Sequence, residues 1–179
     1  AVEGKGLCYY ENPFKAYNFL AEKFKPELRN ENSIGVTAII GEGTFIYPNA
    51  FVGEHVKIGS NCIIHPNATI YSYTEIGNNV IIHANTTIGS DAFYYKRQKT
   101  HYDKMHSAGK VVIADDVEIG SGCTIAAGVS SDTVIGKGTK LDSQVHIGHD
   151  VKIGEHCILA AQVGIAGNTK VGNRVTLYG

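Results

Sequence analysis

The sequence predicts an all-β solenoid in which short parallel strands stack in coils of eighteen residues. Aliphatic residues occupy every sixth position from Ile34 to Ile88 without exception. A helix would repeat every 3.6 residues and an ordinary strand every 2, so a fixed period of six indicates a solenoid. Residues 47–49, 65–67 and 83–85 read Tyr-Pro-Asn, His-Pro-Asn and His-Ala-Asn and lie eighteen positions apart. Three six-residue sides therefore close one coil, and each coil contacts mainly its neighbours.

Each side is expected to point one aliphatic side chain into the axis, with a smaller residue two positions earlier. In the first block the aliphatic positions are Ile34, Ile40, Ile46, Val52, Ile58, Ile64, Ile70, Ile76, Ile82 and Ile88. After an interruption they are Ile113, Ile119 and Ile125 and, following a four-residue step, Val129, Ile135, Leu141, Ile147, Ile153, Leu159, Ile165, Val171 and Leu177. Burial of each contributes about 1.5–3 kcal/mol, so this column is expected to dominate stability. Cys62, Cys123 and Cys157 occupy small inward positions, which favours buried hydrophobes over metal or redox chemistry.

Length and charge exclude several classes of function. The 179 residues correspond to about one domain. A net charge of −1 gives no reason to expect nucleic acid or an anionic membrane as a partner. No apolar run is long enough to span a bilayer, and we expect a cytoplasmic protein. Because the sequence begins at Ala1 without Met, we expect an upstream segment.

Residues 1–33 precede the repeat and are expected to hold one helix, the remnant of an upstream domain. Asn12 suits the N-cap and Pro13 the first helical position, while Pro26 marks the end. The apolar positions at helical spacing are Phe14, Tyr17, Leu20 and Phe24. This stripe predicts a helix that packs on the end of the solenoid and covers its exposed edge.

The solenoid is expected to run over residues 34–179, with residues 89–112 as an inserted loop. The insertion breaks the six-residue period and is largely polar through Gly109. Insertions in a solenoid map to one face, which is often the binding face.

Histidine is the residue type that best indicates chemistry, because imidazole is the usual general base near neutral pH. His146 and His149 flank the inward-facing Ile147 and are the candidates for that role. His65 and His83 lie one coil apart, and we expect them to form a structural ladder at a corner.

Several segments resemble the UDP-3-O-acyl-glucosamine N-acyltransferase family of lipid A biosynthesis. Residues 11–14, Glu-Asn-Pro-Phe, are similar to the segment that enters the family's helix domain. Residues 89–95, Gly-Ser-Asp-Ala-Phe-Tyr-Tyr, resemble the family's Gly-Ala-Asp-Gly-Phe-Gly-Tyr. Residues 144–150, Gln-Val-His-Ile-Gly-His-Asp, resemble its catalytic segment Gln-X-Gln-Ile-(Gly/Ala)-His-Asn, and residues 165–168 match a later coil.

The resemblance implies a left-handed parallel β-helix, although the general rule for parallel crossovers predicts a right hand. It also implies a parallel homotrimer with active sites in the clefts between subunits. The implied reaction moves a 3-hydroxyacyl chain from an acyl carrier protein thioester to the 2-amine of a UDP-(3-O-acyl)-glucosamine, for lipopolysaccharide. It requires no cofactor and no metal.

The implied site is centred on His149, which takes a proton as the amine attacks. Gly167 lies eighteen residues later, one full coil on, and its amide is the expected donor to the oxyanion. The expected substrate-binding residues are Phe93, Tyr95, Asp142 and His146.

The chain departs from the family pattern at three places. Residues 124–128 read Thr-Ile-Ala-Ala-Gly where the family has Thr-Ile-Asp-Arg-Gly, so two charged groups are lost. Asp150 replaces the Asn that follows the catalytic histidine, and a carboxylate there would stabilise an imidazolium. The family's uracil-binding residues lie upstream of Ala1.

Three other functions remain open from the sequence. Acetyl transfer from acetyl-CoA to a nucleotide sugar would use the same histidine. A γ-type carbonic anhydrase would need three histidines around zinc, and His101 and His106 have that family's spacing but lie in the insertion. An inactive scaffold would fit Ala126 and Ala127.

Overall fold

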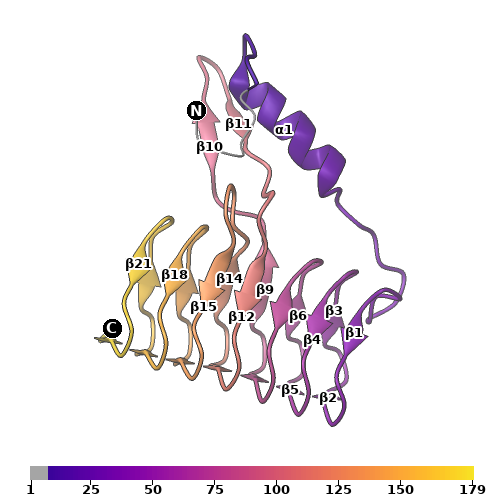
Figure 1. Ribbon diagram of the computed structural model, residues 1–179, viewed down its shortest axis with the longest axis vertical. Coiled ribbons are helices and arrows are strands. Elements are labelled where there is room, and N and C mark those ends of the chain that lie inside the picture. Colours follow the sequence, from indigo (N-terminus) through magenta and orange to yellow (C-terminus); the bar gives the residue numbers. More distant parts are fainter. Residues whose placement is uncertain (1–7) are drawn as a thin grey trace.

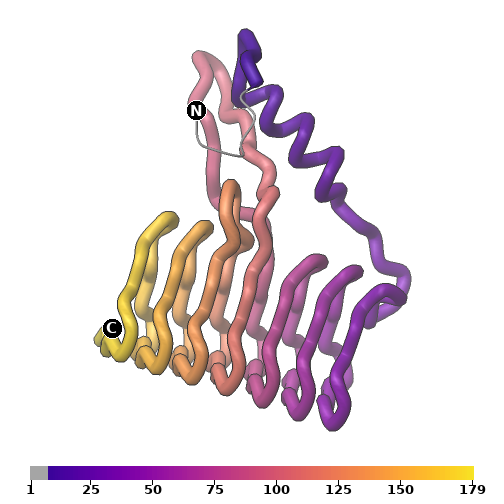
Figure 2. The backbone as a smooth tube through the Cα atoms, viewed as in Figure 1, coloured from indigo at the N-terminus to yellow at the C-terminus, as the bar shows by residue number. Residues whose placement is uncertain are grey.

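The computed structural model describes residues 8–179 and forms a left-handed parallel β-helix with one α-helix and one inserted hairpin (Figure 1). Short strands of successive coils pair in parallel and build three sheets, which form the three sides of the solenoid. The expected fold class is therefore confirmed. The chain builds the solenoid coil by coil from β1 to β22. The hairpin projects from its middle, and the helix lies beside the hairpin and leads by a linker to the first coil (Figure 2).

We number the three sheets in the order in which the chain meets them. Sheet 1 holds β1 (Ile39–Ile40), β4 (Lys57–Ile58), β7 (Glu75–Ile76), β12 (Val111–Ile113), β15 (Thr133–Ile135), β18 (Lys152–Ile153) and β21 (Lys170–Val171). Sheet 2 holds β2 (Phe45–Ile46), β5 (Ile63–Ile64), β8 (Ile81–Ile82), β13 (Glu118–Ile119), β16 (Lys140–Leu141), β19 (Ile158–Leu159) and β22 (Thr176–Leu177). Sheet 3 holds β3 (Phe51–Val52), β6 (Thr69–Ile70), β9 (Thr87–Ser90), β14 (Thr124–Ala126), β17 (His146–Ile147) and β20 (Gly164–Ile165).

The register follows the eighteen-residue repeat seen in the sequence. Ile58 lies beside Ile40 on one side and Ile76 on the other, so equivalent residues stack. At many corners the chain adopts a left-handed backbone conformation that few side chains tolerate. Asn67 and Asn85 take φ values of 60° and 61° there, which explains why Asn recurs in the corner triplets.

The core is the column of inward aliphatic residues together with the smaller residues that precede them. Ile64, Ile82 and Ile147 are fully buried, and so is Cys62 at a small position. Burial also raises the pKa of the Cys123 thiol, which keeps it neutral. The three cysteines at small positions therefore act as buried hydrophobes, as expected.

Helix α1 (Pro13–Phe24) begins where the sequence predicts. The Asn12 side chain accepts a hydrogen bond from the Lys15 amide at 3.2 Å and caps the first turn. The expectation that this helix covers the end of the solenoid is wrong. Ile34 and Ile40, in the first coil, keep 38% and 37% of their surface exposed, and the helix lies against the insertion instead (Figure 1).

The insertion folds into an antiparallel hairpin of β10 (Tyr95–Arg97) and β11 (Tyr102–Lys104). Helix α1 binds this hairpin through polar contacts. Asn18 donates to the Lys104 carbonyl at 2.8 Å and accepts from the His106 amide at 3.1 Å. Glu22 pairs with the His106 ring at 2.6 Å. Of the apolar stripe, Phe14 and Tyr17 line a hollow shared with the insertion, whereas Leu20 and Phe24 remain exposed.

Val129 does not occupy an inward position, so the register expected there is wrong. It is buried, but it lies outside the central core, in a corner lengthened by the four-residue step. We call residues 127–132, between β14 and β15, the enlarged corner. Its backbone turns outward, and its amides face the next coil.

Within residues 8–179, the helix α1 is too short to cross a membrane.

Candidate active site

His149 lies at the corner where the chain passes from sheet 3 to sheet 1, between β17 and β18. The enlarged corner is the equivalent corner of the preceding coil, and residues 166–169 form that of the following coil. The insertion leaves the solenoid at this same edge, after β9. The stacking of coils therefore gathers His149, the enlarged corner and the hairpin, which are far apart in the sequence.

The Asp150 carboxylate is surrounded by hydrogen-bond donors from the enlarged corner. Its Oδ2 accepts from the Val129 amide at 2.9 Å, and its Oδ1 accepts from the amides of Ser130 at 3.0 Å and Ser131 at 2.6 Å. The Ser131 hydroxyl adds a fourth bond at 2.9 Å. Only 5% of the Asp150 side chain is exposed.

These donors fix the charge state of Asp150. Burial alone would raise the pKa of its carboxyl, but the hydrogen bonds from His149, Val129 and Ser131 outweigh burial and lower that pKa. The group is therefore an anion at neutral pH and can only accept hydrogen bonds. The buried charge is compensated by oriented dipoles, as buried charges require.

The imidazole of His149 is oriented by this anion. Its Nδ1 lies 2.7 Å from Asp150 Oδ2, and since the carboxylate only accepts, Nδ1 carries the proton. The other nitrogen, Nε2, then has a free lone pair. The Tyr94 ring meets the imidazole edge to face, with 5.4 Å between centroids. His149 keeps 19% of its side chain exposed.

Gly167 stacks on His149 as the eighteen-residue spacing predicts. The Asn168 amide donates to the His149 carbonyl at 2.7 Å and joins the two corners. A methyl group built on Gly167 would lie 2.5 Å from Nε2, so only glycine lets the ring stand there. Within residues 8–179 the Gly167 amide donates no hydrogen bond. The base nitrogen thus lies against the Gly167 backbone.

The other predicted site residues are distributed over several surfaces. His146 lies on β17 with its Nδ1 2.7 Å from the Thr124 hydroxyl. Asp142 sits at a different corner, between sheets 2 and 3, where it accepts a hydrogen bond from the Ser143 amide at 2.6 Å. Phe93 and Tyr95 flank Tyr94 and stack edge to face at 5.1 Å. The structure brings His149 and Gly167 together, and it separates Asp142 from them.

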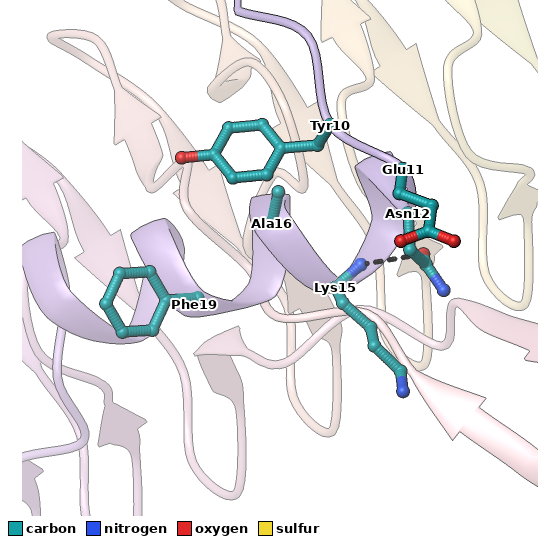
Figure 3. Close-up of a pocket in the computed structure, with 6 residues that line it drawn as sticks. All are labelled: Tyr10, Glu11, Asn12, Lys15, Ala16 and Phe19. Atoms are coloured by element: carbon teal, nitrogen blue, oxygen red, sulfur yellow. Dashed lines mark hydrogen bonds between the residues drawn. The ribbon is translucent and has the colours of Figure 1, made fainter.

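Two hollows adjoin Tyr94. One of about 550 Å³ is lined by the aromatic residues Phe93, Tyr94, Tyr95 and Tyr102. Another of about 390 Å³ lies between α1 and the hairpin, with Tyr94 again in its wall. A larger hollow of about 710 Å³ runs along the outer face of α1, past Tyr10 and Phe19 (Figure 3). Tyr94, whose ring meets that of His149, lines the two smaller hollows and is not among the residues that line the third.

Two functional features escaped the sequence reasoning. Tyr94 was missed because the family pattern has Gly at its position, whereas Phe93 and Tyr95 match that pattern. The role of the enlarged corner was also missed. The four extra residues between Ile125 and Ile135 were the available signal, since an insertion at one corner of a regular coil has to serve something there.

Four other histidines pair with residues outside the His149 corner. The His65 and His83 rings stack at 4.9 Å and form the expected ladder, which Tyr47 extends at 5.2 Å. His101 lies 3.1 Å from Asp103, whereas His106 pairs with a carboxylate on α1. The two therefore do not converge, and residues 8–179 contain no group of three or more His, Cys, Asp or Glu side chains arranged to hold a metal.

The fold and repeats are similar to those of bacterial hexapeptide-repeat transferases. The family model for the bacterial transferase hexapeptide (six repeats) matches residues 37–72 and 132–167. Both matched segments lie in the β-helix, and the second includes His149 and Gly167.

The expected resemblance to UDP-3-O-acylglucosamine N-acyltransferases is confirmed. The chain is 44% identical to the one from Methylobacterium nodulans over 91 residues, which is 51% of this chain and 26% of that protein. It is 46% identical to the one from Rhodopseudomonas palustris over 80 residues, 45% of this chain and 22% of that protein. The matches thus span about a quarter of the length of these curated relatives.

A solved structure of a related enzyme matches the β-helix as well. The UDP-N-acetylglucosamine acyltransferase from Bacteroides fragilis superposes with a TM-score of 0.69 and 28% identity. The superposition covers 80% of this chain and 54% of that one. Both sets of similar proteins are named as acyltransferases that act on UDP-sugars.

Proposed function

We propose that this chain catalyses transfer of a 3-hydroxyacyl group to the 2-amine of a UDP-(3-O-acyl)-glucosamine in lipid A biosynthesis. The donor in this proposal is an acyl carrier protein thioester, so no cofactor is needed. The similarity to named UDP-3-O-acylglucosamine N-acyltransferases supports the acceptor.

The proposed chemistry requires a base and an oxyanion donor on the same reacting centre. The amine attacks the thioester carbon, and a C–N bond forms as the carbonyl oxygen becomes negative. His149 Nε2 takes the proton that the amine loses, while the Gly167 amide donates to the oxyanion. The intermediate then collapses, the C–S bond breaks, and the thiolate leaves with the proton held by the imidazolium. The products are an amide and a free thiol.

The observation that carries this proposal is the orientation of His149. Asp150 binds Nδ1–H at 2.7 Å, which leaves the lone pair of Nε2 free, and Gly167 packs against the ring at Nε2. The same carboxylate stabilises the imidazolium that forms during the reaction. The enlarged corner fixes the carboxylate, so the base is held in place before a substrate arrives.

The aromatic hollow beside Tyr94 suits the apolar parts of such substrates. Phe93 and Tyr95 line it, which keeps both as candidate substrate-binding residues. His146 lies on the exposed face of β17 and remains a second candidate. Asp142 lies at another corner, so it can contact substrate only if a neighbouring subunit brings its own His149 close. The proposed parallel homotrimer provides such clefts between subunits.

A direct test compares acceptors and donors with the purified chain. We expect turnover with UDP-3-O-acyl-glucosamine and a 3-hydroxyacyl thioester of acyl carrier protein, and none with UDP-N-acetylglucosamine, whose nitrogen is already acylated. Turnover of UDP-N-acetylglucosamine alone would contradict the acceptor assignment. It would instead favour acyl transfer to UDP-N-acetylglucosamine, the sugar nucleotide that the solved relative's name contains.

The alternatives have their own outcomes in the same assays. Faster turnover with acetyl-CoA than with acyl carrier protein would favour a nucleotide-sugar acetyltransferase. Bound zinc together with carbon dioxide hydration would favour the anhydrase, which the separate partners of His101 and His106 do not support. A chain that is inactive with both donors would favour an inactive scaffold, in line with the uncharged Ala126 and Ala127.

A further inference from the structure

Helix α1 reaches the catalytic corner through a single side chain. The Tyr17 hydroxyl donates a hydrogen bond to the Val129 carbonyl, across 112 positions of sequence. The N–H of that same peptide group belongs to Ser130 and donates to Asp150 Oδ1 at 3.0 Å. We propose that Tyr17 is a positioning residue for His149, acting through the Val129–Ser130 peptide and Asp150. The kinetic part of this proposal rests on the function proposed above.

The proposed coupling follows from the polarity of the peptide group. A hydrogen bond accepted by the carbonyl withdraws charge from the attached nitrogen and strengthens the bond that its N–H donates. The Val129 carbonyl also accepts from the amides of Ala108 at 3.0 Å and Gly109 at 3.3 Å. Tyr17 is thus one of three donors that polarise this peptide toward Asp150. It is the only one of the three that comes from a side chain.

Tyr17 is in the right protonation state to donate. Burial raises the pKa of its phenol above the ordinary value, and the nearby Asp150 charge acts in the same direction. These effects outweigh a hydrogen bond from the Ala108 amide, which lowers that pKa. The hydroxyl therefore remains a neutral donor at any pH at which His149 could act as a base.

The enlarged corner is packed so tightly that a shift at Val129 must also move the residues that donate hydrogen bonds to Asp150. A Cβ on Gly128 or on Gly109 would collide with the Ser131 carbonyl, so the enlarged corner and the end of the insertion meet without spare room. The Gly109 amide also donates to the Gly128 carbonyl at 2.9 Å. Ser131 supplies two of the bonds to Asp150, at 2.6 and 2.9 Å. Loss of the Tyr17 contact is therefore expected to loosen the whole set of donors around the carboxylate.

The competing explanation is that Tyr17 only attaches the helix to the rest of the molecule. Asn18 provides the matched control, because it is the next residue on the same helix and makes two hydrogen bonds to the insertion. Those bonds end at Lys104 and His106 and do not touch the enlarged corner. If attachment alone matters, removal of either side chain should have the same effect.

The experiment compares Tyr17→Phe with Asn18→Ala in the complete chain. The first readout is the Nδ1–H proton of His149 in a ¹⁵N-edited NMR spectrum, assigned by its loss in His149→Gln. We expect Tyr17→Phe to weaken this signal by faster exchange with water and Asn18→Ala to leave it unchanged. The second readout is acyl transfer, where loss of one hydrogen bond is expected to lower kcat about three- to tenfold with KM unchanged in Tyr17→Phe alone.

Two results would overturn the proposal. One is a Tyr17→Phe protein with an unchanged Nδ1–H signal, and the other is an Asn18→Ala protein with the same signal loss as Tyr17→Phe. If the wild-type chain proves to have no acyl transfer, the proposed function fails, but the NMR comparison still decides whether Tyr17 positions His149.

Discussion

Replacement of Gly167 by alanine would displace the imidazole without straining the backbone. The added methyl carbon would lie 2.5 Å from His149 Nε2 and 2.8 Å from both neighbouring ring carbons. Ordinary contact begins at 3.4 Å, so the ring has to move by about 0.9 Å, the difference between 3.4 and 2.5. Gly167 does not have a positive φ, so alanine itself fits the local conformation.

A shift of that size breaks the geometry of the proposed base. Moving the ring by about 1 Å lengthens or bends its 2.7 Å bond to Asp150 and turns Nε2 away from the reacting centre. Misplacement of a catalytic group by about 1 Å can lower the rate about a hundredfold. We therefore expect Gly167→Ala to lower kcat by about that factor while the melting temperature changes little, since the site lies at the surface of the solenoid.

The control is Gly164→Ala, on the adjoining strand β20. A methyl group there would meet nothing within 4 Å, so it should leave kcat unchanged. The assay is steady-state acyl transfer with both variants, alongside thermal unfolding. A folded Gly167→Ala protein with wild-type kcat would refute the claim that catalysis depends on the position of the His149 ring against Gly167.

Three further predictions concern the core, the buried carboxylate and the assembly. Ile58→Ala should lower the free energy of unfolding by about 2–5 kcal/mol in a denaturant titration, because Ile58 is packed between two coils, and a loss below about 1 kcal/mol would contradict the inward register. The lowered pKa of Asp150 should stabilise the fold above its ordinary value of 3.8, and this contribution should fade as pH falls through the lower folded value. The denaturation midpoint should therefore drop more steeply at acid pH in wild type than in Asp150→Asn. The same pH dependence in both proteins would contradict a stabilising role for the ionised Asp150. Light scattering should give a trimer at micromolar concentration, and a monomer would remove the clefts between subunits from the proposed function.

The regular part of this molecule could be predicted from the sequence because each coil makes the same local contacts. The six-residue period identifies Ile64 and Ile147 as inward, and their complete burial follows from stacking alone. The same period places Gly167 over His149. Prediction works here because a solenoid turns a distance in sequence into a distance in space.

The irregular parts could not be predicted in this way. The packing of α1 depends on the hairpin, whose direction no periodicity specifies. The inward orientation predicted for Val129 was wrong. In the sequence, an aliphatic residue so close to the expected register cannot be told from the inward residue of another repeat. Only the structure shows that its backbone serves Asp150 instead. Tertiary hydrogen bonds of this kind leave no pattern in a single sequence.

The measurement that tests the proposed role of His149 most directly compares His149→Ala with His146→Ala. His149 is bound to the buried Asp150 and packs against Gly167, whereas His146 lies on β17 with its Nδ1 2.7 Å from the Thr124 hydroxyl. We predict that His149→Ala keeps its assembly state and melting temperature but loses at least about a hundredfold in kcat, the contribution typical of a general base. His146→Ala should have a milder effect. A folded His149→Ala protein that transfers the acyl group at the wild-type rate would contradict the proposed mechanism, even with the fold and the family resemblance intact.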